Sequence, residues 1–268
     1  MNALELLRKG EIEQALAELQ NQVRRNPASF KDRVFLFQLL VVMGEWDRAL
    51  TQLNVTGELD AAALAMVQTY REALRCEVFR REVSAGKRVP LVFGQPQAWV
   101  AHLIESFRLL ARGRAAQSQA LREQAFEAAP VRSGAITVGD KAGVPERFSW
   151  IADADPRFGP VLEAIINGRY YWVPFENVRR LDIEPPADLR DVVWMPAHFE
   201  WTNGGETVAL LPTRYAGSES SADPQIRLAR KTDWSEAAVG LFVGMGQRML
   251  ASDAGEYPLM EIRNIVFD

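Results

Sequence analysis

The sequence is poor in the residues that metal sites and disulfides require. Its 268 residues include one cysteine, Cys76, and two histidines, His102 and His198. A single cysteine excludes an intramolecular disulfide and is typical of a reducing compartment. Zinc sites take several converging Cys or His ligands, so we expect no metal site. A P-loop and a complete dinucleotide-binding fingerprint are both missing, and we therefore expect no cofactor.

Long apolar runs and an excess of basic charge are also missing. No stretch approaches the ~20 apolar residues of a membrane span, and the charged start Glu5–Arg8 differs from the apolar core of a signal peptide. The formal net charge is −4, so no basic field would attract nucleic acid or an anionic membrane. We expect a cytoplasmic protein that binds neither nucleic acid nor membrane.

One segment occurs twice in the first half of the chain. Gly10–Leu16 reads GEIEQAL, and Gly44–Leu50, which begins 34 residues later, reads GEWDRAL. This period is that of the tetratricopeptide repeat (TPR), a helix–turn–helix unit whose arrays bind peptides or helices of other proteins. The repeat and the helical spacing of apolar residues predict helices over residues 2–9, 12–25, 29–43, 46–55, 60–85, 99–112 and 115–129. We therefore expect an all-α, TPR-like domain over residues 1–130.

The pattern changes to short strands near residue 131. Alternating residues and turn signals predict strands over residues 135–138, 147–151, 169–173, 191–202, 207–211, 240–245 and 260–267. A turn at 139–143 would join the first two strands, and Phe158–Asn167 is predicted to form one short helix that ends at Gly168. We expect a β-rich domain over residues 131–268, built as a curled sheet or a small barrel. The predicted fold class is α+β.

Residues suited to catalysis are sparse. No serine lies in a nucleophile elbow. Turn and cap roles beside prolines, as in Asp155-Pro156 and Glu184-Pro185, explain the carboxylates that could suggest an acid–base pair: Asp153, Asp155, Asp182, Glu184, Asp188 and Asp191. The alternative is a hydrolase or transferase with a site between the domains, around His198 with Asp191 or Glu200. A structural role explains His198 better, so we predict no catalytic residues and no enzyme.

Aromatic residues gather in the second half. Exposed Trp and Tyr residues dominate the binding energy of many protein interfaces. The candidate binding anchors are four aromatic residues, with Arg190 as a charged residue that would orient the partner: Tyr170, Trp172, Trp194 and Trp201. Packing inside the β-rich domain is the alternative role of each aromatic ring.

Six stretches of the chain are distinctive: Leu6–Gly10, Ala15–Leu16, Gly168–Phe175, Ile183–Pro186, Asp188–Ala197 and Leu211–Tyr215. In these stretches the chain resembles the ImpE/SciE family, also called TagJ. Members of this family are accessory proteins of the bacterial type VI secretion system. The resemblance covers nearly the whole chain and brings no catalytic residue with it.

The resemblance implies a non-catalytic adaptor. Family members are associated with the small subunit of the contractile sheath, of the TssB/VipA type, through a helical segment near its N-terminus. They are also linked to ClpV, the ATPase that disassembles contracted sheaths. We therefore expect the sheath helix as the partner and a link to ClpV as a second contact. The groove of the helical repeats and the aromatic β-rich domain are both open as the place of the sheath contact.

Overall fold

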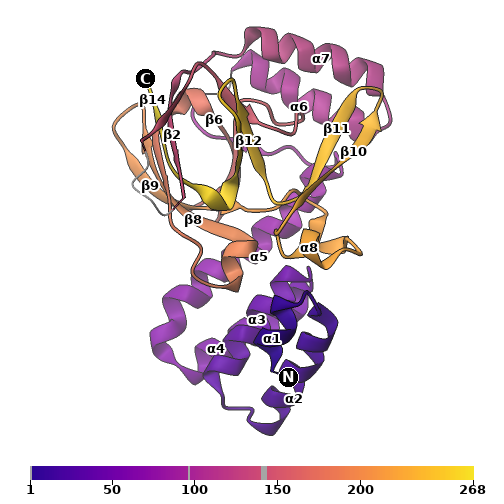
Figure 1. Cartoon of the computed structure of the whole chain (residues 1–268), viewed down its shortest axis with the longest axis vertical. Helices are drawn as coiled ribbons and strands as arrows, with labels where there is room; N and C mark the ends of the chain where they lie inside the picture. Colours follow the sequence, from indigo (N-terminus) through magenta and orange to yellow (C-terminus); the bar gives the residue numbers. More distant parts are fainter. Residues whose placement is uncertain (1, 96, 140–143) are drawn as a thin grey trace.

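The structure is a computed structural model that describes residues 2–95, 97–139 and 144–268. Helices form nearly all of its first half (Figure 1). They are α1 (Ala3–Arg8), α2 (Ile12–Arg25), α3 (Phe30–Val42), α4 (Trp46–Leu59), α5 (Leu64–Ser84), α6 (Ala98–Ala111) and α7 (Ala115–Ala128). The seven predicted helices are all present, with ends that agree within four residues. A short 3₁₀ turn, η1 (Ala61–Ala63), precedes α5.

The duplicated segment builds the same helix corner twice. Gly10 joins α1 to α2 with φ of 82°, and Gly44 joins α3 to α4 with φ of 72°. Glycine adopts this left-handed conformation without steric cost because it has no Cβ. Ala15 and Ala49, which follow at equivalent positions, are both completely buried. The small side chains let the two helices of each pair approach closely.

A nine-stranded sheet forms the centre of the second half, in the order β1-β6-β5-β9-β8-β7-β14-β2-β3. Its strands are β1 (Leu91–Val92), β2 (Gly134–Val138), β3 (Glu146–Phe148), β5 (Val161–Ile166), β6 (Arg169–Pro174), β7 (Val178–Ile183), β8 (Trp194–Trp201), β9 (Glu206–Pro212) and β14 (Ile262–Phe267). All neighbours are antiparallel except β1 and β6. Within the described residues the order is that of an open sheet with β1 and β3 at its edges.

Two smaller sheets complete the second half. Strands β4 (Ile151–Asp153), β12 (Met249–Ser252) and β13 (Glu256–Pro258) form one, and β10 (Thr232–Ala238) pairs with β11 (Leu241–Gly246) in the other. Short helical turns connect the strands: η2 (Phe175–Asn177), η3 (Leu189–Val192), η4 (Ser218–Ser220), α8 (Pro224–Arg227) and η5 (Leu259–Glu261). The single strand expected over 147–151 is thus divided between β3 and β4. Residues 140–143 of the expected turn lie outside the described residues.

The helix predicted over Phe158–Asn167 is wrong, because these residues include strand β5. All six residues of β5 are buried, since β6 and β9 flank the strand and both faces of the sheet are covered. Such a strand lacks the alternation that identifies a half-exposed one. Asn167 and Gly168 have φ of 48° and 72° and form the two-residue turn between β5 and β6. This positive φ at both positions is typical of a tight β-hairpin.

Two buried clusters lie on opposite faces of the large sheet. The first joins helices and strands, with Phe37 and Leu103 packed in the same cluster as Trp172 and Trp194. The second lies on the other face and includes Val173, the next residue after Trp172. Neighbouring residues of a strand point to opposite faces, which explains this division. The helical half therefore shares a core with one face of the sheet.

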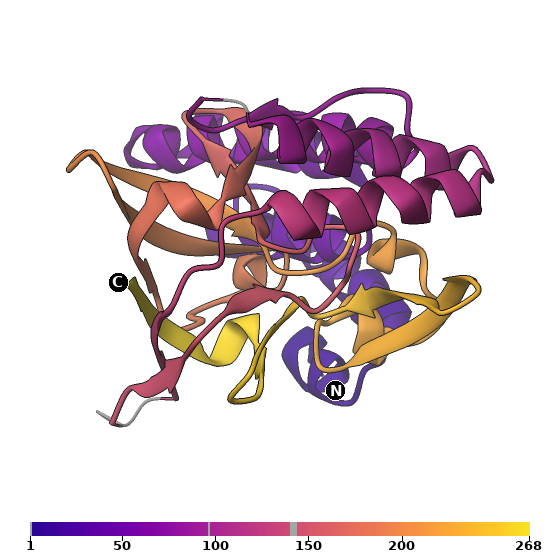
Figure 2. The ribbon, with the colours of Figure 1, turned by 90° about the horizontal axis from the view of Figure 1, so that it is seen from above.

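The helices lie at two places around the sheet. Figures 1 and 2 show α6 and α7 side by side along the top of the molecule, while α1 to α4 form its bottom end. Helix α5 lies between these groups and contacts β6. The predicted boundary after residue 130 falls between α7 and β2. Whether residues 1–130 and 131–268 are separate domains stays a prediction.

Candidate functional site

The structure buries the four aromatic residues predicted as binding anchors. Trp194 is 0% exposed, Trp172 1%, Tyr170 3% and Trp201 4%. The ring of Trp194 packs 6.4 Å from that of Trp46 and 5.7 Å from that of Tyr70, both on helices. These rings therefore act as core residues in this structure. A direct contact of Tyr170, Trp172 or Trp194 with a partner would require the helices to separate from the sheet.

The predicted residues also do not form one surface. Trp201 lies on the other face of the sheet from Trp194, where it stacks on Phe93 and Phe199. Arg190 lies near the helices, with its guanidinium 4.8 Å from the centre of the Tyr70 ring. The same guanidinium forms an ion pair with Asp188, two residues away. Arg190 thus orients a contact within the chain.

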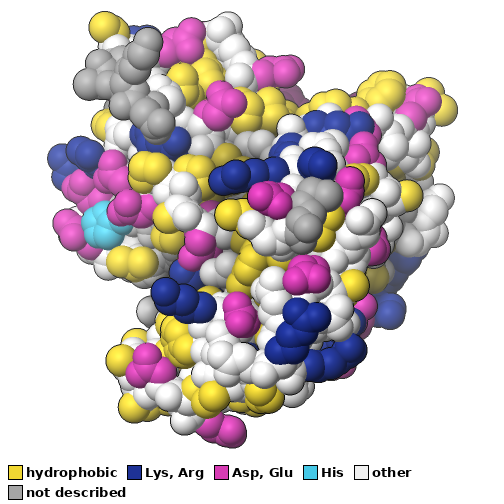
Figure 3. Space-filling view, turned by 60° about the horizontal axis from the view of Figure 1, so that its bottom comes forward, with side chains coloured by type: hydrophobic (Ala, Val, Ile, Leu, Met, Phe, Trp, Pro, Cys, Tyr) yellow, Lys and Arg dark blue, Asp and Glu magenta, His cyan; other side chains and the backbone are white. Residues whose placement is uncertain are grey.

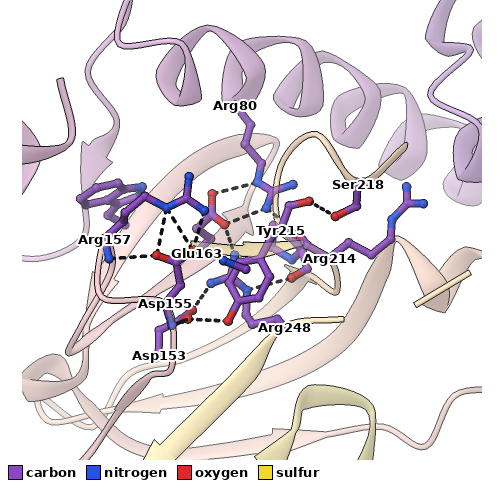
Figure 4. A network of polar contacts seen from close by, with 12 residues as sticks. Arg80, Asp153, Asp155, Arg157, Glu163, Arg214, Tyr215, Ser218 and Arg248 are labelled. Atoms are coloured by element: carbon purple, nitrogen blue, oxygen red, sulfur yellow. Dashed lines mark hydrogen bonds and ion pairs between the residues drawn. The ribbon is translucent and has the colours of Figure 1, made fainter. Parts of the chain in front are cut away.

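A buried network of charged residues joins α5 to the strands (Figure 4). Arg80 of α5 donates from Nε and Nη2 to the two carboxylate oxygens of Glu163 on β5, each at 2.8 Å. Arg248, which is completely buried, forms ion pairs with both Glu163 and Asp153. Tyr215 donates its hydroxyl hydrogen to Asp153 at 2.8 Å. Every charge in this group therefore has an opposite charge beside it.

The network is suited to holding the fold together rather than to chemistry. Burial alone would raise the pKa of Glu163, but the guanidiniums of Arg80 and Arg248 lower it to about 2. Such a carboxylate stays ionised and fully hydrogen-bonded, which makes it a poor proton acceptor at neutral pH. Sequence reasoning missed this network. The available signal was Glu163, a charged residue inside the apolar run Val161–Ile166.

Two further arginines cap α1 and α3, the helices that precede the two copies of the duplicated segment. Arg230 donates to the carbonyl oxygens of Leu7 and Arg8 at the end of α1, at 2.9 and 3.2 Å. Arg214 donates to the carbonyl oxygen of Val42 at the end of α3, at 2.9 Å. The last carbonyls of a helix carry partial negative charge, which a guanidinium stabilises. Arg8 and Val42 are 34 residues apart, so the two caps occupy equivalent positions of the repeat.

The residues between Arg214 and Arg230 also cover the corners between the helices. Glu219 of η4 lies so close to Gly44 that an added Cβ would be 2.5 Å from its Cγ. Arg227 of α8 forms an ion pair of 2.7 Å with Glu13 of α2. Turn η3 also contacts α3. The chain itself therefore covers the corners at Gly10 and Gly44 of the helical array.

The residues of the enzymatic alternative have separate partners. His198 lies on β8 with 43% of its side chain exposed, 3.4 Å from Glu206. Glu200 forms an ion pair with Arg179, and the Asp191 carboxylate accepts the backbone N–H groups of residues 187 and 188. No hydrogen bond connects the three side chains among the described residues. Their geometry does not assemble a catalytic site.

An open apolar groove lies between α7 and β4. Its volume is about 290 Å³, and its lining includes Phe126, Pro130, Val131, Trp150 and Ile151. The rings of Phe126 and Trp150 are 39% and 42% exposed, and Val131 is 74% exposed. Large exposed apolar side chains that share a groove mark an interaction site more often than scattered ones do. We call this surface the Phe126–Trp150 groove.

The residues that the structure describes also bear on metal sites, membrane-spanning helices and a reactive cysteine. In this part of the chain, no group of three or more His, Cys, Asp and Glu side chains could hold a metal ion. None of the helices within it is long and apolar enough to cross a membrane. Cys76 is buried, and burial raises the pKa of its thiol to about 12. This thiol is therefore unsuited to nucleophilic chemistry.

Comparison with known proteins identifies the family. The model of the ImpE protein family matches residues 145–266. The type VI secretion system accessory component TagJ of Pseudomonas aeruginosa is 51% identical over 268 residues, which are 100% of this chain and 92% of that protein. A crystal structure of a Vibrio parahaemolyticus protein has the same fold, with a TM-score of 0.87, 24% identity, and coverage of 99% of this chain and 97% of that one. The resemblance found in the sequence is confirmed, and the chain belongs to the ImpE family.

Proposed function

We propose that this chain is a non-catalytic, cytoplasmic accessory protein of type VI secretion that binds the N-terminal helix of the small sheath subunit, of the TssB/VipA type. Its full-length identity of 51% to TagJ supports a role in type VI secretion. The separate partners of His198, Asp191 and Glu200 support the absence of catalysis. In this proposal the first half is a TPR-like scaffold. A link between the sheath and the ClpV ATPase is the second part of the proposal.

The Phe126–Trp150 groove is the observation that carries the helix-binding role. An amphipathic helix docks by placing its apolar face, spaced i, i+3, i+4 and i+7, in an apolar groove. Phe126 of α7 supplies one side of such a groove, and Trp150 and Ile151 supply the other. Aromatic side chains of this kind provide most of the binding energy in many interfaces. They replace the buried Trp172 and Trp194 as the proposed anchors.

The test is a calorimetric titration of the whole chain with a peptide that covers the N-terminal helix of the small sheath subunit. We expect saturable binding, with Trp150→Ala and Phe126→Ala each weakening it about tenfold or more. Trp234→Ala is the matched control, because Trp234 is a tryptophan of similar exposure, 40% against 42%, on β10. Both tryptophan variants change an exposed ring, so both are expected to fold.

The possible results separate the partner from its site. No binding of the peptide to the folded wild-type chain would contradict the proposed partner. Binding that Trp150→Ala and Trp234→Ala weaken equally, or that neither weakens, would keep the partner and reject the groove. Circular dichroism of each variant shows whether a loss of binding reflects a loss of fold.

A further inference from the structure

We infer that a second groove, between α2 and α4, binds an acidic segment of a partner protein that carries an aliphatic side chain among its carboxylates. We call it the Arg24–Arg48 groove. Helices α2, α3 and α4, which line it, lie at the bottom of the molecule in Figure 1, whereas α7, which supplies Phe126 to the Phe126–Trp150 groove, lies at the top. The inference does not depend on the proposed function.

The groove has an apolar floor between two polar walls. Its volume is about 330 Å³. Leu36 and Leu40 of α3 form the floor, Arg24 of α2 lies on one wall, and Arg48 and Gln52 of α4 lie on the other. Figure 3 shows Lys and Arg side chains on this end of the molecule, interspersed with Asp, Glu and apolar ones. The combination suits a ligand that has both an aliphatic and a charged part.

The charge of the groove is positive. None of the residues that line it is a carboxylate. Arg24 donates to the neutral amide oxygen of Asn21 and has no ion-pair partner within the described residues. Arg48 lies 3.7 Å from Glu45, and both side chains are about half exposed, at 47% and 45%. Such an exposed pair contributes little, so both guanidiniums can bind a carboxylate of a partner.

Gln52 adds a hydrogen-bond donor on the wall that carries Arg48. Its side-chain oxygen accepts a hydrogen bond of 2.9 Å from Nη1 of Arg33. Arg33 is itself held by the carbonyl oxygen of Pro27, at 2.6 Å from its Nε. Since the oxygen of Gln52 is engaged, the amide nitrogen is the group left to donate to a ligand. Arg24, Arg48 and Gln52 therefore all supply donors, as an anionic ligand requires.

The duplicated segment provides a natural comparison. A related groove of about 490 Å³ lies between α4 and α5, where Asn54 and Glu58 follow Gln20 and Arg24 by 34 residues. Here a carboxylate, Glu58, takes the place of Arg24. Asn54 is engaged by Arg71, which donates to its side-chain oxygen at 2.9 Å. The α4–α5 groove thus carries both signs of charge, whereas the charged side chains that line the Arg24–Arg48 groove are both arginines.

The test measures fluorescence anisotropy of a labelled peptide made of Glu and Ala around one central Leu, titrated with the full chain. We expect saturable binding that salt weakens, and about tenfold weaker binding of the peptide with Gln in place of Glu. Arg24→Glu and Arg48→Glu are each expected to remove this preference. Arg75→Glu is the matched control, because Arg75 is an exposed arginine that lines the α4–α5 groove instead.

Three results would overturn the inference. They are the absence of saturable binding to the folded chain, equal binding of the Glu and Gln peptides, and an equal effect of Arg24→Glu and Arg75→Glu.

A further titration adds the sheath-helix peptide as a competitor. Because the two grooves are separate, we expect it to leave the anisotropy unchanged. Displacement of the acidic peptide would reject the Arg24–Arg48 groove as a separate site.

Discussion

At the scale of single residues, Glu163 shows how burial changes the role of a side chain. A lone carboxylate in a protein core is strongly unfavourable, because it loses its hydration. Here Arg80 and Arg248 supply opposite charges from α5 and from the residue before β12. Removing one partner of such a buried group leaves the other unpaired. Glu163 therefore holds together elements that are distant in the sequence.

This arrangement predicts a specific pH dependence of stability. The pKa of Glu163 is lowered from 4.5 to about 2, since the two guanidiniums outweigh the effect of burial. The unfolded chain binds this proton more readily, so the stabilisation by Glu163 is complete above about pH 4.5 and is lost as the pH falls toward 2. Glu163→Gln is expected to remove this part of the acid destabilisation, about 3 kcal/mol over the window. Urea unfolding at a series of pH values measures it.

Glu206→Gln is the control for this experiment. Glu206 is 65% exposed, and its substitution is expected to change the unfolding free energy by less than about 0.5 kcal/mol at each pH. If Glu163→Gln and the wild type lost stability in parallel between pH 4.5 and 2, the assigned role of Glu163 would be wrong.

At the scale of elements, the helix corners show how a local pattern becomes tertiary contact. Gly44 and Gly113 each end the first helix of a pair, and both have φ of 72°. They differ in their surroundings. A Cβ at Gly44 would meet Glu219, whereas a Cβ at Gly113 would meet nothing within 4 Å. The same backbone turn is thus covered by the chain in one case and open in the other.

We expect Gly44→Ala to destabilise the protein more than Gly113→Ala. The change at Gly113 has only the backbone strain of a left-handed alanine, about 1 kcal/mol. The change at Gly44 adds overpacking against Glu219, about 1–3 kcal/mol more. The free energy of unfolding in urea measures both. Equal effects would mean that η4 moves away from α3 without cost and does not cover the corner firmly.

Elements also show where prediction from sequence succeeded and where it failed. The seven helices of the first half were predicted because their apolar residues recur at the spacing of a helix. Strand β5 was mistaken for a helix because both of its faces are buried, which removes the alternation of a half-exposed strand. The turn at Asn167 and Gly168 was the available correction, since it matches a hairpin as well as a helix end.

At the scale of the whole molecule, the helices and the sheet share one buried cluster. Trp172 and Trp194 are strand residues whose indole rings pack in the cluster formed with the helices. The network of Arg80 and Glu163 crosses the same contact. Leu36 and Leu40 of this cluster also form the floor of the Arg24–Arg48 groove, while the Phe126–Trp150 groove lies between α7 and β4. Two separate grooves on one chain suit an adaptor.

This shared core predicts a single unfolding transition for the full chain. Tryptophan fluorescence responds to all seven tryptophans, among them Trp172 and Trp194 at the contact between helices and sheet, while far-ultraviolet circular dichroism responds mainly to the helices. We expect the two signals to change at the same urea concentration, because neither half can expose Trp172 and Trp194 without disrupting the other. Two transitions with different midpoints would instead support independent folding of residues 1–130 and 131–268.

The sequence by itself determined the helices, about half of the described strands, the duplicated corners and the family. The helices and strands follow from the short-range spacing of apolar residues, the corners from glycine at turns, and the family from stretches that resemble its members. All three can be read from the sequence before the fold is known. Only the tertiary structure decided which residues are exposed. Trp194 and Trp150 are both tryptophans near strands, yet one is completely buried and the other lines an open groove. Exposure depends on which distant elements pack over a side chain, and the local sequence does not specify them.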